Sequence, residues 1–187
     1  MPKKGKLFVI SGPSGVGKDT LVGLVLPGSA GLERVVTATT RPPRPGERDG
    51  INYWFITAEE FDRRIKDGEF LEWAVVHGNR YGTPGPAVSE KLEHGISLVL
   101  AIDIQGAKSI RNEMREAVTI FIAPPSFKEL EKRLRGRSTE CDAEINGRIR
   151  TAEDEMAHMD KYDYAIVNTD LEQAAGELKQ IIEAHTG

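Results

Sequence analysis

The chain has 187 residues, of which 39% are hydrophobic and 29% are charged, a composition that suits one soluble domain and excludes a disordered chain. Its formal net charge of −4 excludes a general attraction to nucleic acid or membranes, so any affinity for phosphate must come from local clusters of Lys and Arg. Cys141 is the only cysteine, which excludes an intrachain disulfide, and no early apolar run is long enough for a signal peptide or membrane span, so we expect a cytoplasmic protein.

The first predicted element is a buried strand at Leu7–Ile10, followed by the segment Gly12-Pro13-Ser14-Gly15-Val16-Gly17-Lys18-Asp19-Thr20. Its glycines allow the backbone N–H groups to turn inward around phosphate oxygens, and the helix predicted from Asp19 to Leu26 adds its positive N-terminal end. Lys18 can reach the outer phosphates. The segment therefore predicts a phosphate-binding loop. The alternative is a glycine-rich turn that binds no ligand.

One residue of this loop departs from the usual pattern. The position after the lysine is normally Ser or Thr, whose hydroxyl binds magnesium, whereas this chain has Asp19. A carboxylate is a hard oxygen ligand, so Asp19 could hold Mg2+ directly or through water, and Thr20 could still contact a phosphate. Without the metal, however, Asp19 would repel a polyphosphate.

An inserted lobe is predicted for residues 35–94. The segment from Thr37 to Glu47 places Arg41 and Arg44 on a proline-stiffened turn, and such a pair suits a phosphate monoester. The alternative is a solvated basic loop. A short helix at Glu59–Lys66, started at Thr57, and a strand at Leu71–Val76 are expected to follow.

The rest of the chain alternates between strand and helix patterns, which predicts a right-handed α/β fold with a parallel sheet. We expect strands at Ile96–Ile104, Val118–Ile122 and Tyr164–Val167, and helices at Gly106–Glu116, Ser126–Leu134 (with a capping box between Ser126 and Glu129) and Leu171–His185. A second insertion is expected at 133–159. Four histidines lack a partner at motif spacing and are assigned to the surface or to packing: His77, His94, His158 and His185.

Several motifs in the same order resemble the guanylate kinase family over nearly the whole chain. They are the loop at Gly12, the segment from Thr37 to Gly46, Glu69–Trp73, Tyr81–Thr83, Ile102–Gly106, Phe121–Ser126, Arg137, Arg148 and Ile166–Asn168. The resemblance implies a P-loop three-layer core (residues 5–34, 95–132 and 160–187), a GMP-binding lobe (35–94) and a mobile lid (133–159).

The resemblance also implies residue roles. Glu72 would accept hydrogen bonds from guanine N1–H and the exocyclic amine, which adenine does not present. Thr37 and Thr83 would lie near the guanine, and Asp103 would contact the nucleotide. Residues that match the family's clamp on the GMP phosphate are Arg41, Arg44, Tyr53 and Tyr81. Arg137 and Arg148 match lid arginines that approach the transferring phosphoryl group, and Asn168 matches a residue near the adenine.

The predicted activity is Mg2+-dependent transfer of the γ-phosphoryl group from ATP to GMP or dGMP, with Lys18, Arg41, Arg137 and Arg148 as catalytic residues. Ala101 stands where the family commonly has an acidic residue, so the metal site departs from the family twice. One alternative is a related module that binds partners without catalysis, and another is a sugar-phosphate kinase of the same fold. The sequence fits either a monomer or a homodimer.

Overall fold

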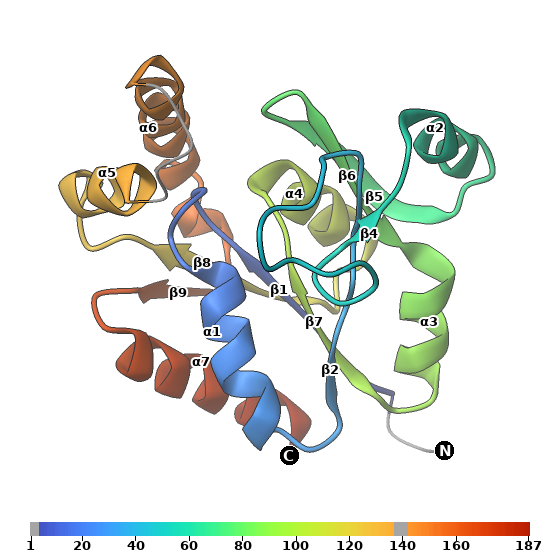
Figure 1. The fold of residues 1–187 in the computed structure, drawn as a ribbon. Coiled ribbons are helices and arrows are strands. Elements are labelled where there is room, and N and C mark those ends of the chain that lie inside the picture. The colour runs from blue at the N-terminus through green and yellow to red at the C-terminus, as the bar shows by residue number, and fades with distance from the viewer. Residues whose placement is uncertain (1–3, 137–141) are drawn as a thin grey trace.

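The computed structural model describes residues 4–136 and 142–187, and its centre is a sheet of five parallel strands. The strands lie in the order β2-β7-β1-β8-β9. They are β1 (Leu7–Ser11), β2 (Leu32–Arg34), β7 (Ser97–Ala101), β8 (Val118–Ala123) and β9 (Tyr164–Val167). Since β1 lies in the middle, its carboxyl end opens onto the segment at Gly12 at the centre of one sheet edge (Figure 1).

Helices cover both faces of this sheet. Phe8 and Ile10 pack on one face with α1 (Lys18–Val25) and α7 (Leu171–Thr186), and Leu7 and Val9 pack on the other face with α3 (Gly85–Glu93) and α4 (Ile104–Glu113). Alternate residues of a strand point to opposite faces, and β1 is apolar throughout because both of its faces are buried. The predicted three-layer α/β fold is confirmed.

A second, smaller sheet forms beside the first, in the order β4-β3-β6-β5. Its strands are β3 (Ala38–Thr39), β4 (Trp54–Phe55), β5 (Phe70–Val76) and β6 (Asn79–Pro84). Helix α2 (Ala58–Lys66) begins where the Thr57 hydroxyl accepts a hydrogen bond from the N–H of Glu60, as the sequence predicts. Phe61 of α2 is fully buried, and its ring centroid lies 4.6 Å from that of Phe70 on β5.

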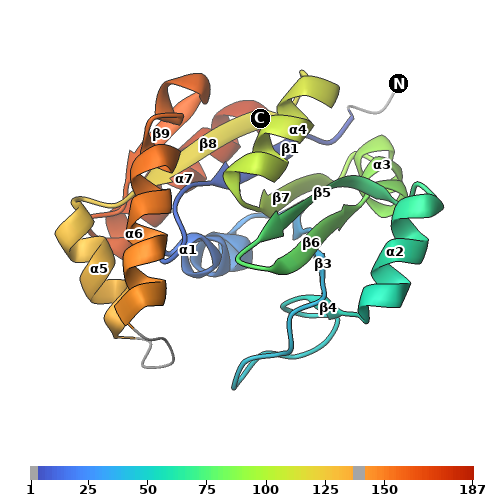
Figure 2. The ribbon, with the colours of Figure 1, turned by 90° about the horizontal axis from the view of Figure 1, so that it is seen from above.

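The remaining helices are α5 (Phe127–Arg135) and α6 (Asp142–Met156), with short 3-10 turns at Leu26–Gly28 and Met159–Lys161. Leu130 and Leu134 of α5 pack against Ile145 and Ala152 of α6 in a separate apolar cluster. Figure 2 shows this pair of helices on the opposite side of α1 and β1 from the second sheet. The α5–α6 pair and the second sheet therefore face each other across the segment between β1 and α1.

The predicted boundaries differ from the observed ones in instructive places. The strand expected at Ile96–Ile104 ends at Ala101, and α4 starts at Ile104 because the Asp103 carboxylate accepts hydrogen bonds from the N–H groups of Gln105 and Gly106. The capping box at α5 is wrong in its second half: Ser126 accepts from the N–H of Glu129, but the Glu129 carboxylate pairs with Arg133.

The elements that had no prediction from the sequence include β2, β3, β6 and α3. Helix α3 lies within the segment predicted as the lobe, yet its Val88 and Leu92 pack on the main sheet, so the division into core, lobe and lid stays a prediction. Across the described residues, none of the helices combines the length and the apolar character needed to span a bilayer.

Candidate active site

The loop between β1 and α1 has the backbone geometry of a phosphate cradle. Gly12, Gly15 and Gly17 all have positive φ, at 138°, 87° and 100°. A Cβ at Gly12 would lie 2.1 Å from the carbonyl oxygen of Ile122 on β8, so only glycine fits there. The Nζ of Lys18 turns back over the loop and donates to the carbonyl oxygens of Gly12, at 2.5 Å, and Pro13, at 3.1 Å.

Two side chains from distant segments fasten this loop. Asn168, after β9, is 1% exposed, and its Nδ2 donates to the carbonyl oxygen of Val16 at 2.7 Å. Arg133 of α5 donates from Nη2 to the carbonyl oxygen of Asn168 at 3.1 Å. Among the described residues, the Oδ1 of Asn168 is buried without a hydrogen-bond partner. The loop is therefore anchored to β9 and to α5 before any ligand binds.

A buried carboxylate lies in the second sheet. Glu72 of β5 is 6% exposed, and the fully buried Thr83 of β6 donates a hydrogen bond from Oγ1 to its Oε1 at 2.5 Å. Gly106 of α4 makes room for it, because a Cβ there would lie 2.5 Å from Oε2. Burial raises the pKa of Glu72 to about 7; the Thr83 hydrogen bond opposes this rise, while the charges of Asp103 and Glu113 add to it.

Arg41 is held rigidly at the end of the small sheet. Its two terminal nitrogens bind both oxygens of Glu47 at 2.9 Å, and its guanidinium lies 5.3 Å from the centre of the Tyr53 ring. Burial opposes the charge of Arg41, but hydrogen bonds to Glu47 and Tyr81 raise its pKa above the ordinary value. The backbone N–H of Arg44 also donates to Glu47, at 2.7 Å. Glu47 thus fixes the side chain of Arg41 and the backbone of Arg44.

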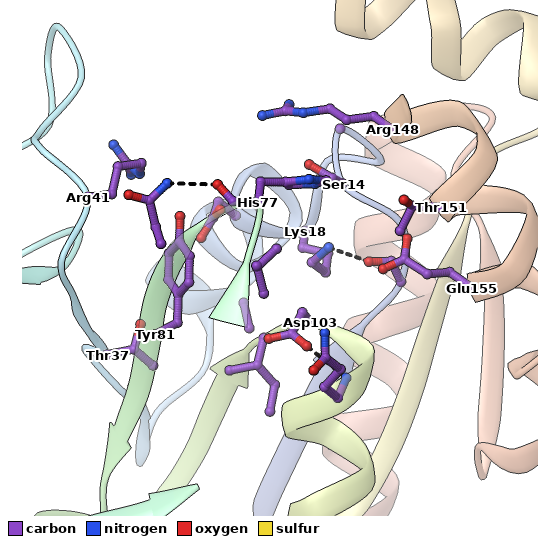
Figure 3. Close-up of a pocket in the computed structure, with 18 of the residues that line it drawn as sticks. Ser14, Lys18, Thr37, Arg41, His77, Tyr81, Asp103, Arg148, Thr151 and Glu155 are labelled. Atoms are coloured by element: carbon purple, nitrogen blue, oxygen red, sulfur yellow. Dashed lines mark hydrogen bonds between the residues drawn. The ribbon is translucent and has the colours of Figure 1, made fainter. Parts of the chain in front are cut away.

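These groups surround a cavity of about 370 Å3, within the range of small-molecule sites. Figure 3 shows Thr37, Arg41 and Tyr81 on one side and Arg148, Thr151 and Glu155 of α6 on the other, with Lys18 between them. Other predicted residues that line the cavity are Gly12, Ser14, Gly15, Gly17, Asp19, Thr20, Arg44, Tyr53 and Asp103. A cationic loop and a cationic clamp therefore face the same space.

Three carboxylates also line this cavity. Asp19 belongs to the first turn of α1, Asp103 caps α4, and Glu155 comes from α6. Burial raises the pKa of Glu155, the charge of Lys18 opposes the rise, and that of Asp103 adds to it. The described residues hold no cluster of three or more side chains placed to bind a metal ion together.

The guanylate kinase family model matches residues 4–185. The guanylate kinase of Rubrobacter xylanophilus is 46% identical over 180 residues, which cover 96% of this chain and 94% of the relative. That of Clostridioides difficile is 47% identical, over 97% of this chain and 89% of the relative. The chain belongs to the guanylate kinase family. The crystal structure of guanylate kinase from Anaplasma phagocytophilum is 35% identical, with a TM-score of 0.84 over 99% of this chain and 88% of that one.

The structure of this guanylate kinase family member brings most of the predicted site residues together but not all of them. Glu72, Thr83 and Asn168 are buried in the adjoining structure and do not line the cavity itself. Pro13 and Val16 contribute backbone carbonyls that bind Lys18 and Asn168. Arg137 lies outside the described residues.

Other residues at the guanylate kinase site had no role predicted from the sequence. Glu47, Thr151 and Glu155 sit in charged or polar helical and turn segments, where sequence offers no signal of a site. His77, assigned to the surface, lines the cavity from the two-residue β5–β6 turn, with φ at 48°. The sequence also offers no sign of an ion pair between Arg34 of β2 and Asp19.

Proposed function

We propose that the residues around this cavity transfer the γ-phosphoryl group of ATP to GMP or dGMP, giving ADP and GDP or dGDP. The observation that carries the proposal is the shared cavity, in which the loop at Lys18 faces the clamp at Arg41. Phosphoryl transfer asks a protein mainly for positioning and charge neutralisation, and this arrangement offers both.

The acceptor half of the site would be the second sheet. Arg41, Arg44, Tyr53 and Tyr81 would hold the GMP phosphate, with two cations and two phenolic hydroxyls around one dianion. The Tyr53 and Tyr81 ring centroids are 5.9 Å apart, and burial raises the pKa of Tyr53, which keeps it a neutral hydrogen-bond donor. Because Glu47 already fixes Arg41, the clamp is preorganised and loses little freedom when GMP binds.

Guanine would be selected by Glu72, with Thr37, Thr83 and Asp103 completing the base site. An ionised Glu72 accepts two hydrogen bonds from guanine, whereas adenine would leave this buried charge with the Thr83 hydroxyl and no donor from the base. Glu72 and Thr83 sit behind the lining of the cavity, so we expect the guanine to enter between the small sheet and α4.

The donor half would be the phosphate loop. Backbone N–H groups of residues 12–20, apart from Pro13, which has none, would bind the β- and γ-phosphates of ATP. Lys18 would exchange its two loop carbonyls for phosphate oxygens. By the resemblance, Asn168 would lie near the adenine, and its Oδ1 is buried without a hydrogen-bond partner in the described part of the chain.

In the transfer step, an oxygen of the GMP phosphate forms a bond to the γ-phosphorus as the bond to the β–γ bridging oxygen breaks. The attacking oxygen is already ionised, so no general base is needed. Charge that develops on the transferred group and on the leaving ADP oxygen is neutralised by Lys18, by Arg148 of α6 and, by the resemblance, by Arg137. Closure of α6 excludes the water that would hydrolyse ATP.

The donor set fits a magnesium ion. Mg2+ keeps several waters and binds one or two carboxylates together with phosphates, and Asp19, 59% exposed beside the loop, supplies one such carboxylate. When bound, Mg2+ supplies charge neutralisation at the β- and γ-phosphates. Replacing Asp19 with Ser should shift the Mg2+ concentration at half-maximal rate, and an unchanged titration would remove Asp19 from the metal site.

The decisive experiment measures ADP formation from ATP and Mg2+ with GMP, dGMP, AMP, ribose phosphate or no acceptor. We expect turnover with GMP and dGMP, and its loss in Lys18→Ala. Turnover with ribose phosphate alone would favour the sugar-phosphate kinase. Absence of turnover with every acceptor would favour a binding module, although such a module has no evident use for the intact loop.

A further inference from the structure

The contact between Asp19 and Arg34 has no place in the roles assigned so far. The Nη2 of Arg34 donates to the Oδ1 of Asp19 at 2.5 Å. Asp19 lies in the first turn of α1, immediately after Lys18, and Arg34 is the last residue of β2, immediately before the acceptor segment begins. The pair therefore connects the donor loop to the start of the acceptor lobe.

The two side chains differ in their surroundings. Asp19 is 59% exposed and lines the cavity, whereas the side chain of Arg34 is 21% exposed and does not line it. The Nε of Arg34 is buried and, within the described residues, has no hydrogen-bond partner. A buried N–H without a hydrogen-bond partner costs free energy. Arg34 is nevertheless held in place by its surroundings and by the carboxylate of Asp19, unlike a freely moving surface arginine.

The charge of Asp19 is the problem that this contact addresses. Helix N-termini favour anions, so Asp19 does not conflict with α1, but it stands where a polyphosphate with several negative charges would bind. Two unit charges 4 Å apart interact by about 1 kcal/mol in water and by more near a protein surface. A guanidinium on one carboxylate oxygen cancels most of this repulsion.

The opposite charges of Asp19 and Arg34 also act on Tyr53, in the neighbouring clamp for the GMP phosphate. Burial raises the pKa of Tyr53; the charge of Asp19 raises it further, and the charges of Arg34 and Arg41 oppose that. Both members of the pair are thus close enough to the GMP phosphate clamp to act on it, with opposite signs.

We propose that Arg34 is a positioning residue for the donor site, which binds Asp19 and neutralises it so that an acidic residue can follow Lys18 in a loop that receives ATP. The inference rests on the proposed function in one respect, that ATP binds this loop. Arg34 acts through Asp19 and does not contact the nucleotide. The 59% exposure of Asp19 leaves it accessible to a hydrated cation at the same time.

The test is a double-mutant cycle on ATP binding, measured by titration calorimetry in EDTA and about 0.15 M salt, where exposed charges more than about 8 Å from the nucleotide are largely screened. Arg34→Gln should weaken ATP binding roughly tenfold, because Asp19 then faces the phosphates unneutralised. In an Asp19→Asn background the same Arg34→Gln change should alter the dissociation constant by less than about twofold, since the charge to be neutralised is gone.

A matched control is Arg80→Gln, which removes another Arg–Asp pair at the same 2.5 Å distance, between Arg80 of β6 and Asp62 of α2. It should leave ATP binding unchanged. If Arg34→Gln does not fold, three proteins replace it: Arg34→Lys, Asp19→Asn, and Asp19→Asn combined with Arg34→Gln. Arg34→Lys is expected to bind ATP within about threefold of the wild type.

Three outcomes would overturn the inference while leaving the proposed function intact. Arg34→Gln could bind ATP as the wild type does. It could weaken binding equally in both backgrounds, which would mean that Arg34 acts on the nucleotide directly. Arg34→Lys could bind as poorly as Arg34→Gln. Failure of the wild type itself to bind ATP would instead overturn the proposed function, and the inference with it.

Discussion

The buried carboxylate of Glu72 should make the fold less stable than it would be with a neutral side chain. We predict that Glu72→Gln stabilises the protein at pH 8 although it impairs GMP binding. The glutamine keeps the size of the side chain and an Oε1 acceptor for the Thr83 hydroxyl, so the substitution removes charge with little change in packing. The expected gain comes from the desolvation that raises the Glu72 pKa.

The magnitude follows from the pKa. A rise from the ordinary value of 4.5 to about 7 costs the ionised form about 3 kcal/mol of folding free energy, at about 1.4 kcal/mol for each pKa unit. Because the folded-state pKa is raised, the folded state binds the proton more tightly than the unfolded state does. Stability from this group is therefore fully present below pH 4.5 and is lost as the pH rises through about 7.

The assay is urea unfolding of both proteins at pH 5 and pH 8, without nucleotide. The variant should exceed the wild type by about 2 to 3 kcal/mol at pH 8 and by less than about 1 kcal/mol at pH 5. Other groups titrate alike in both proteins and cancel in the difference. A variant that is no more stable at pH 8, or a difference that does not change with pH, would refute a desolvated Glu72.

Three further predictions concern the substrates. The KM for GMP should rise as the pH falls below about 7, because Glu72 becomes protonated, and this dependence should vanish in Glu72→Gln, where only the titration of GMP itself remains. Glu47→Gln should raise the KM for GMP roughly tenfold with a smaller change in kcat, since Arg41 loses its bidentate partner; equal KM values would show that Arg41 needs no such support. Arg148→Ala should lower kcat by roughly 100-fold or more while calorimetric GMP binding stays unchanged, and weakened GMP binding would move Arg148 out of the transfer step.

The parts of the fold that the sequence predicts well are those set by local pattern. β1 and β8 are apolar runs buried on both faces of the sheet, and the edge strand β9 is also an apolar run, although only its Ile166 is buried. The glycines after β1 have few roles other than a tight phosphate loop. Strands β2 and β6 carry no such pattern. β2 has only three residues and is determined by pairing with the distant β7. β6 contains Gly82 and Pro84 and is determined by its hairpin with β5 and by pairing with the distant β3.

The site shows the same division between local and distant effects. The motif residues that form the loop and the clamp could be named in advance, because their residue types suit phosphate wherever they fold. The Glu47 contact with Arg41, the Arg34 contact with Asp19 and the approach of Glu155 to the cavity could not, because each depends on how separate elements pack. The capping box predicted at α5 is a similar case: the Ser126 half forms, but the Glu129 carboxylate pairs with the nearby Arg133 instead of capping the helix.

The small sheet has consequences for how selectivity can change. It holds the carboxylate at Glu72 and the clamp at Arg41, while the loop at Lys18 belongs to the main sheet, and the two sheets share no strand. Under the proposed function, the choice of acceptor and the choice of donor therefore depend on residues of two different sheets that both face the cavity. Substitutions within the small sheet can therefore change which nucleobase is accepted while the loop that holds the donor stays the same.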